Sequence, residues 1–128
     1  MSCPKFYKCD ACKVIIEVIA GKNETFECCG NVMTEMTANT SEGAHEKHLP
    51  VIEISDNIVT VKVGAVLHPM LEEHSIEWIY LETKQGSQRK KLSPSQDPIA
   101  KFVITDDDAP VAAYAYCNLH GFWKTEIK

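Results

Sequence analysis

The feature that most constrains the fold is a cluster of cysteines near the N-terminus. Four of the six cysteines form a CxxC pair and an adjacent pair: Cys9, Cys12, Cys28 and Cys29. The composition changes near residue 37, where residues 37–43 are small, polar and turn-prone. About 36 residues are too few to fold by hydrophobic burial alone. We therefore expect a metal-stapled domain at residues 1–37, followed by a second domain at residues 38–128.

The cysteines are expected to bind metal rather than to form disulfides. Residues 1–5 lack the charged lead and apolar stretch of a secretory signal, so we expect a cytoplasmic protein in a reducing compartment. Four thiolates suit zinc or iron. A zinc ribbon that only folds the segment stays an alternative, although the strained adjacent pair slightly favours a redox iron. Cys3 is left over and is expected to be a free thiol near a frayed end.

The charge balance argues against a nucleic-acid partner, and the hydrophobic pattern argues against a membrane span. The net charge is −5 and the pI is about 5.5, so no broad basic face is available to neutralise phosphates. The dense basic run at residues 89–91 is expected to be a solvated hairpin edge. No apolar stretch is long enough to span a bilayer.

Beyond residue 37 the hydrophobic pattern has a period of two. The alternating runs are residues 51–54, 58–63, 76–83, 89–92, 100–104 and 111–116. They are rich in β-branched and aromatic residues, and turn signals at residues 55–57 and 85–87 separate some of them. No stretch shows helical periodicity over three turns. An antiparallel β-sandwich is therefore predicted.

All five histidines follow residue 37, and several lie where a strand is expected to begin or end. His68 follows one predicted strand, His74 precedes the next, and Cys117 and His120 form a CxxH turn after the last. Strand ends of a sandwich cluster in space, so these side chains can converge on one ion. Imidazoles suit zinc, copper and iron, and a thiolate adds electron density to the metal.

In this order the motifs resemble those of the two-iron superoxide reductases, also called desulfoferrodoxins, over essentially the whole chain. The motifs are the two cysteine pairs, Glu46-Lys47-His48-Leu49-Pro50, His68-Pro69-Met70 with His74, and Cys117-Asn118-Leu119-His120-Gly121. The resemblance implies a mainly β chain with a desulforedoxin-like N-terminal domain and an immunoglobulin-like antiparallel β-sandwich. It also implies two irons per chain. One would bind Cys9, Cys12, Cys28 and Cys29; the other would bind His48, His68, His74 and His120 with Cys117 as axial ligand.

The function implied by the resemblance is one-electron reduction of superoxide to hydrogen peroxide. Glu46 would fill the open iron position in the resting ferric state, and Lys47 would attract the superoxide anion. An external donor such as a rubredoxin would return the electron, and a homodimer is expected. Two residues depart from the family pattern: His45 is read as a non-ligand, and Ala115 stands where some members carry a glutamate.

Three other functions fit parts of this pattern. An electron carrier or zinc-stabilised module would use the histidines structurally. A cupredoxin would need two histidines, one cysteine and a weak axial group, and the presence of four candidate histidines argues against it. An iron enzyme that dismutates superoxide is the nearest rival, and oxygen release during turnover would separate it from a reductase.

Overall fold

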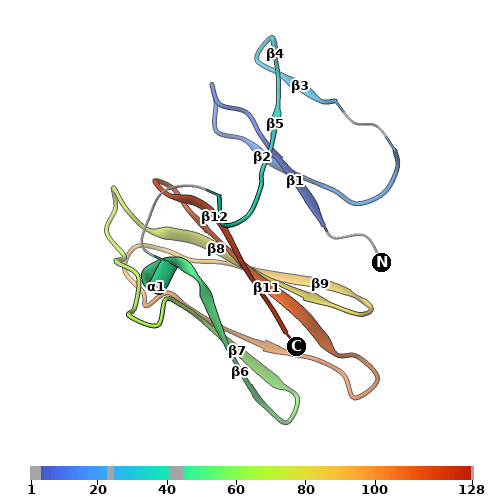
Figure 1. The fold of residues 1–128 in the computed structure, drawn as a ribbon, viewed down its shortest axis with the longest axis vertical. Coiled ribbons are helices and arrows are strands. Elements are labelled where there is room, and N and C mark those ends of the chain that lie inside the picture. The colour runs from blue at the N-terminus through green and yellow to red at the C-terminus, as the bar shows by residue number, and fades with distance from the viewer. Residues whose placement is uncertain (1–3, 23–24, 41–44, 128) are drawn as a thin grey trace. The chain divides into compact units, whose positions relative to one another are not determined.

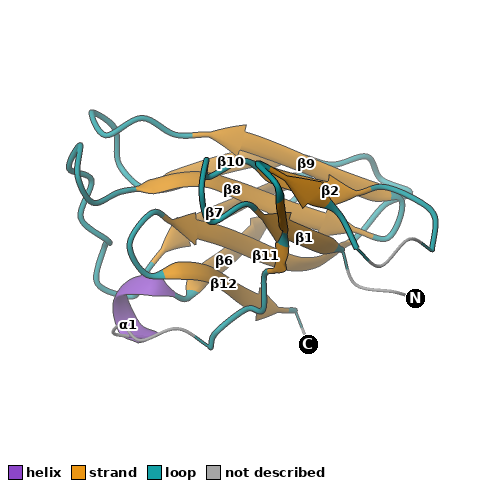
Figure 2. Cartoon of the chain, turned by 90° about the horizontal axis from the view of Figure 1, so that it is seen from above, coloured by secondary structure: helices purple, strands orange, loops and turns teal. Residues whose placement is uncertain are grey.

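The computed structural model describes residues 4–22, 25–40 and 45–127, except the side chain of Glu46. The chain divides into two compact units, Met1–Thr37 and Ala38–Lys128. Strands make up nearly all of the regular structure, and the short helix α1 (His45–His48) is the single helix among the described residues (Figure 2). It is far too short to cross a membrane. The predicted mainly β fold is confirmed.

The first unit is built from short strands. Its three-stranded antiparallel sheet has the order β2-β1-β5, from β1 (Lys5–Lys8), β2 (Ile15–Val18) and β5 (Thr34–Glu35). A separate hairpin pairs β3 (Glu27–Cys28) with β4 (Asn31–Val32). Its small core is a cluster of the buried side chains of Tyr7, Cys9 and Met33, and Phe6 is the other buried apolar side chain among the described residues of this unit. Strands of two to four residues are too short to show alternation, so the sequence did not predict them.

The second unit contains two antiparallel sheets (Figure 1). One has the order β10-β7-β6, from β6 (Pro50–Ser55), β7 (Ile58–Val63) and β10 (Ile99–Val103). The other has the order β12-β11-β8-β9, from β8 (Ile76–Thr83), β9 (Gly86–Lys91), β11 (Pro110–Cys117) and β12 (Gly121–Glu126). Both sheets contribute to one hydrophobic core, for example Val61 of β7 and Leu81 of β8.

Each of the six predicted runs corresponds to one of these strands, but β12 was missed. Its neighbouring residues Phe122 and Trp123 are both buried, so β12 lacks the expected in-and-out alternation. The CxxH motif therefore does not follow the last strand, as the sequence suggested; it forms the hairpin turn between β11 and β12. The basic residues 89–91 are exposed on the edge strand β9, as predicted.

Candidate metal centres

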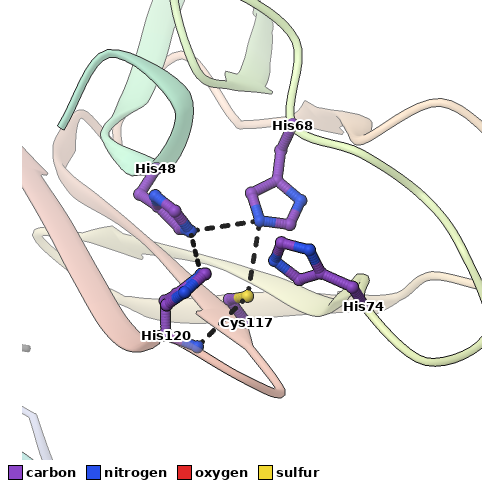
Figure 3. A group of neighbouring side chains, drawn as sticks. All are labelled: His48, His68, His74, Cys117 and His120. Atoms are coloured by element: carbon purple, nitrogen blue, oxygen red, sulfur yellow. Dashed lines mark hydrogen bonds between the residues drawn. The ribbon is translucent and has the colours of Figure 1, made fainter. Parts of the chain in front are cut away.

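Four histidines and one cysteine of the second unit converge on one point (Figure 3). One potential ligand atom from each lies within 4.8 Å of those of the others: His48, His68, His74, Cys117 and His120. They come from α1, from the loop between β7 and β8, and from the turn between β11 and β12. The predicted set of five is thus brought together by three segments that are far apart in the sequence.

The helix α1 is seated against the loop that follows β7. The Leu49 N–H donates to the carbonyl of His45, and the Gly64 N–H donates to the carbonyl of Leu49 at 3.0 Å. Gly64 has a φ of +92°, and a Cβ there would lie 2.8 Å from the carbonyl oxygen of Lys47. Only glycine tolerates both conditions without strain. Gly64 therefore lets the helix that carries His48 approach β7 closely.

The ring of His68 is oriented by its own backbone neighbour. Its Nδ1 lies 2.6 Å from the carbonyl oxygen of Pro69. A carbonyl only accepts, so Nδ1 carries the proton and Nε2 presents a lone pair to the cluster. Burial, with smaller contributions from the neighbouring histidines, lowers the pKa of His68 to about 4, although the hydrogen bond to Pro69 acts in the opposite direction. At neutral pH this imidazole is therefore in the uncharged form that binds metals.

Trp123 holds two of the other histidines. Its fully buried indole stacks on the ring of His48, with centroids 4.9 Å apart, and its Nε1–H donates to the carbonyl of His120 at 3.0 Å. The Nε2 atom of His48 lies 3.1 Å from Nδ1 of His120 and 3.2 Å from Nε2 of His68. One tryptophan thus links the helix α1 to the β11–β12 turn at the point where their ring nitrogens meet.

Cys117 ends β11 and is completely buried. Its Sγ lies 3.3 Å from Nε2 of His68 and accepts the N–H of His120 at 3.4 Å. Burial raises the pKa of this thiol, which backbone N–H groups of residues 119 and 120 partly offset. A metal ion would replace the proton and stabilise the thiolate at this position.

The donor atoms at this cluster fit a bound cation. Nε2 of His74 is buried and has no hydrogen-bond partner within the described part of the chain. The pKa of His74 is lowered, mainly by burial and to a smaller extent by His120. The imidazole is therefore uncharged at neutral pH, and its buried Nε2 is not stabilised by a positive charge on the ring. Several lone pairs that face one another at close range, without enough protons to pair them, are stabilised by a metal.

The first unit carries the second cluster, made by Cys9, Cys12, Cys28 and Cys29. The Sγ atoms of Cys12 and Cys28 lie 3.4 Å apart, and those of Cys28 and Cys29 lie 3.8 Å apart. Metal–sulfur bonds of about 2.3 Å place the thiolates of a tetrahedral site about 3.8 Å apart. Cys29 adopts a left-handed φ of 56°, which is how adjacent residues can both aim at one point.

The thiols of this cluster influence one another's charge. The backbone N–H of Cys12 approaches the Cys9 sulfur at 3.5 Å and lowers the pKa of Cys9 to about 7. Contact with the Cys12 sulfur raises the pKa of Cys28 to about 12, and the same neighbour raises the pKa of Cys29. Four thiolates at these distances need a cation among them, so this donor set also fits a metal.

Other residues singled out from the sequence lie outside the two clusters. Lys47 and His45 are exposed, and neither belongs to a cluster of candidate ligands. Ala115 is fully buried in the core, where it pairs with Ile79 and Trp123. The Glu46 side chain and Cys3 lie outside the described residues.

Sequence reasoning missed the residues that support the ligands. Trp123 stacks on His48, Gly64 seats α1, and Asn118 hydrogen-bonds the loop beside His74. Their only signal in the sequence is that they lie near candidate ligands. Contacts between distant segments cannot be read from the sequence of either segment alone.

The model of the family described as Desulfoferrodoxin matches residues 40–126. A desulfoferrodoxin of Nitratidesulfovibrio vulgaris is 48% identical over 122 residues, which is 95% of both chains. A desulfoferrodoxin homolog of Archaeoglobus fulgidus is 44% identical over 119 residues, which is 93% of this chain and 94% of the relative.

A solved structure shares the fold over nearly the full length. The superoxide reductase of Treponema pallidum superposes with a TM-score of 0.84 at 35% identity, covering 98% of this chain and 100% of that one. The family match includes all five residues of the histidine-rich cluster, and the relatives also span the four-cysteine cluster. The chain therefore belongs to the desulfoferrodoxin family.

Proposed function

We propose that this protein is a superoxide reductase, which reduces superoxide to hydrogen peroxide by one electron at a mononuclear non-haem iron. The observation that carries the proposal is the convergence of four imidazoles and one thiolate, all within 4.8 Å of one another. Membership of the desulfoferrodoxin family and the likeness to a solved superoxide reductase support it. The ligands of this iron are His48, His68, His74, His120 and Cys117.

The reaction consumes one electron and two protons for each superoxide. When bound, the iron supplies the electron and a coordination position for the substrate. The chain supplies the ligands, the electrostatic attraction and the protons. Nδ1–H of His68 donates a hydrogen bond to the carbonyl of Pro69. The unprotonated Nε2 is therefore free to bind the metal. The Cys117 thiolate would bind the same iron and, as an electron-rich ligand, would raise the electron density on the metal.

Lys47 provides the positive charge that draws superoxide to the site. The net charge of −5 repels an anion, so a local cation is needed at the entrance. Lys47 is exposed, directly precedes the ligand His48, and lies near enough to His74 that its charge contributes to lowering the pKa of that imidazole. Its ammonium group can also order the water that delivers a proton. Glu46, whose side chain is outside the described residues, would bind the iron in its resting ferric state.

The rest of the proposal concerns the whole chain. Residues 1–37 form a desulforedoxin-like domain with an iron on four cysteines, and residues 38–128 form an immunoglobulin-like sandwich that carries the catalytic iron. The protein is a homodimer, and a rubredoxin or similar one-electron donor reduces it. A cytoplasmic location is consistent with the free thiols of the five described cysteines, which call for a reducing compartment.

The role of Lys47 is tested by Lys47→Ile, with Lys101→Ile as the matched control. Lys101 is also exposed but lies on β10, outside the site. Both variants lose one positive charge. We expect Lys47→Ile to lower the second-order rate with superoxide about tenfold and to weaken its ionic-strength dependence, as measured by pulse radiolysis. The control should keep most of the rate. Equal rates for the two variants would remove Lys47 from the mechanism.

The activity itself is tested by counting products. A reductase supplied with an electron donor releases hydrogen peroxide without oxygen, whereas a dismutase releases one oxygen for every two superoxide ions consumed. Oxygen release in that proportion would overturn the proposed activity. A content of zinc in place of iron at both centres would instead support a purely structural role for the metals.

A further inference from the structure

His74 differs from His48 and His68 in how its ring is held. His68 donates a hydrogen bond to the carbonyl of Pro69, and His48 stacks on Trp123. Among the described residues, the ring of His74 makes no hydrogen bond, and its ring contacts are with the other ligand imidazoles. Its direction therefore depends on the backbone of the short loop that carries it.

That loop is a tight turn with few internal bonds. Leu71 and His74 exchange two backbone hydrogen bonds, at 2.9 and 3.1 Å, and form an isolated bridge. These bonds shape the turn but do not attach it to the other ligand segments. The attachment has to come from outside the loop.

Asn118 provides this attachment through three hydrogen bonds. Its Oδ1 accepts the N–H of Ser75 at 2.9 Å, and its Nδ2 donates to the carbonyl of Glu73 at 3.0 Å. Its backbone N–H donates to the carbonyl of Ser75 at 3.2 Å. The side-chain amide therefore grips the main chain on both sides of His74, across a separation of 43 residues for the Ser75 bond.

The position of Asn118 in the chain gives these bonds their importance. It directly follows Cys117 and precedes His120 by two residues, in the hairpin turn between β11 and β12. A shift of the loop relative to this turn would separate His74 from both ligands. One side chain that offers a donor and an acceptor can fix both sides of the loop, which neither an aspartate nor an alanine can do.

We propose that Asn118 is a positioning residue that holds His74 in register with Cys117 and His120, and so sets how tightly the second centre keeps its metal. The inference rests on the proposed function, because it takes these residues as iron ligands. Residues that orient metal ligands typically change metal affinity about 10- to 100-fold when they are removed.

The test compares Asn118→Ala with Asn57→Ala in the full-length iron-loaded protein. Asn57 is a matched control because its Nδ2 also donates two hydrogen bonds, to the carbonyl of Ile104 at 2.9 Å and to Asp106 at 2.8 Å. Asn57 directly precedes β7, whereas the loop that carries His68 follows the other end of this strand. The rate of iron loss to a chelator is followed by the thiolate charge-transfer band of the second centre.

We expect Asn118→Ala to lose this iron about 10 to 100 times faster than the wild type, while the four-cysteine iron is lost at its usual rate. Asn57→Ala should lose stability but release the second iron at the wild-type rate. Equal release rates for the two variants would overturn the positioning role. A general loss of stability cannot imitate the expected result, because the control also loses two bonds.

A measurement on the metal-free protein separates this inference from the proposed function. Hydrogen exchange of the Ser75 amide should be fast in Asn118→Ala and slow again in Asn118→Asp, which keeps the acceptor oxygen. Unchanged protection of Ser75 in Asn118→Ala would contradict the inference whether or not iron binds. The wild type could bind no metal at this centre while exchange of the Ser75 amide still changes as expected. In that case the proposed function fails, and the attachment of the His74 loop by Asn118 is still supported.

Discussion

The two candidate metal centres differ in what makes them rigid. The first takes its four ligands from residues 9–29, in a unit with very short strands, and Cys12 and Cys29 are exposed. The second takes its five ligands from residues 48–120, at the ends of two sheets that share a core. Cys117, His48 and His68 are buried there.

This difference assigns opposite roles to the metal. The buried core cluster of the first unit contains three side chains among the described residues, so we expect bound metal to supply much of its folding free energy. The second unit has a much larger buried core shared by its two sheets, so we expect it to fold without metal and to hold the candidate ligands in place before a metal binds. We therefore expect the first unit to need its metal in order to fold, and the second unit to form its metal site by folding.

The largest effect should come from removing one ligand of each centre. Cys12 is exposed, so Cys12→Ala leaves no cavity but opens the four-cysteine site. We expect the amides of residues 4–37 to lose protection in hydrogen exchange while the sandwich stays folded, because structural metals contribute about 10 kcal/mol or more. In Cys117→Ser we expect the converse: both units stay folded, and only the second charge-transfer band disappears. A first unit that stays folded in Cys12→Ala would contradict the expectation that metal holds this unit folded.

The next largest effect should follow from Gly64→Ala. The new Cβ would lie 2.3 Å from the carbonyl oxygen of Val66 and 2.8 Å from that of Lys47, at a φ of +92°. We expect a loss of about 2–4 kcal/mol in the free energy of unfolding, together with faster metal loss as α1 and His48 move. Gly86→Ala is the control, since Gly86 also has a positive φ, of +158°, but nothing lies within 4 Å of its Cβ position. Denaturant titration measures both, and equal losses would contradict the seating role of Gly64.

A smaller effect is expected from pH in the metal-free protein. The pKa of His68 is about 4 when folded, below its ordinary value of 6.5, and the pKa of His74 is also lowered. The unfolded chain therefore binds protons first, so the sandwich loses stability as the pH falls from about 6.5 toward 4. Each such histidine contributes a slope of up to about 1.4 kcal/mol per pH unit.

Denaturant titrations at pH 7, 6 and 5 measure this slope, and His68→Leu should flatten it. The first unit has no histidine in its 37 residues, so it contributes no histidine titration in this range. A flat profile for the wild-type sandwich would mean that the imidazoles are not held in a buried, uncharged form.

The smallest effects come from a pair of threonine hydrogen bonds. Thr34 donates to the Asp10 carboxylate at 3.1 Å on the surface of the first unit, and Thr125 donates to the carbonyl of Pro50 at 2.7 Å in a partly buried part of the second. We expect Thr125→Val to cost about 1 kcal/mol and Thr34→Val a few tenths. Thermal unfolding of the metal-loaded protein checks this. A larger loss for Thr34→Val would mean that surface bonds, and not the metal, hold the first unit.

The sequence predicted the members of the two side-chain clusters better than it predicted the residues that support them. Candidate ligands can be recognised by their residue type and spacing, as Cys117 and His120 can. Alternation also located most strands of the sandwich. It missed β12, because Phe122 and Trp123 are both buried, and it missed the short strands of the first unit. Trp123 and Asn118 act through contacts that exist only after distant segments have packed together.

Five side chains of the second unit are expected to bind one iron. Anomalous diffraction at the iron edge, from crystals of the purified full-length protein, tests this directly. We predict two peaks per chain: one among the four cysteine sulfurs, and one bonded to His48, His68, His74, His120 and the Sγ of Cys117. A single peak at the cysteines, or a second iron that Cys117 does not touch, would contradict the account.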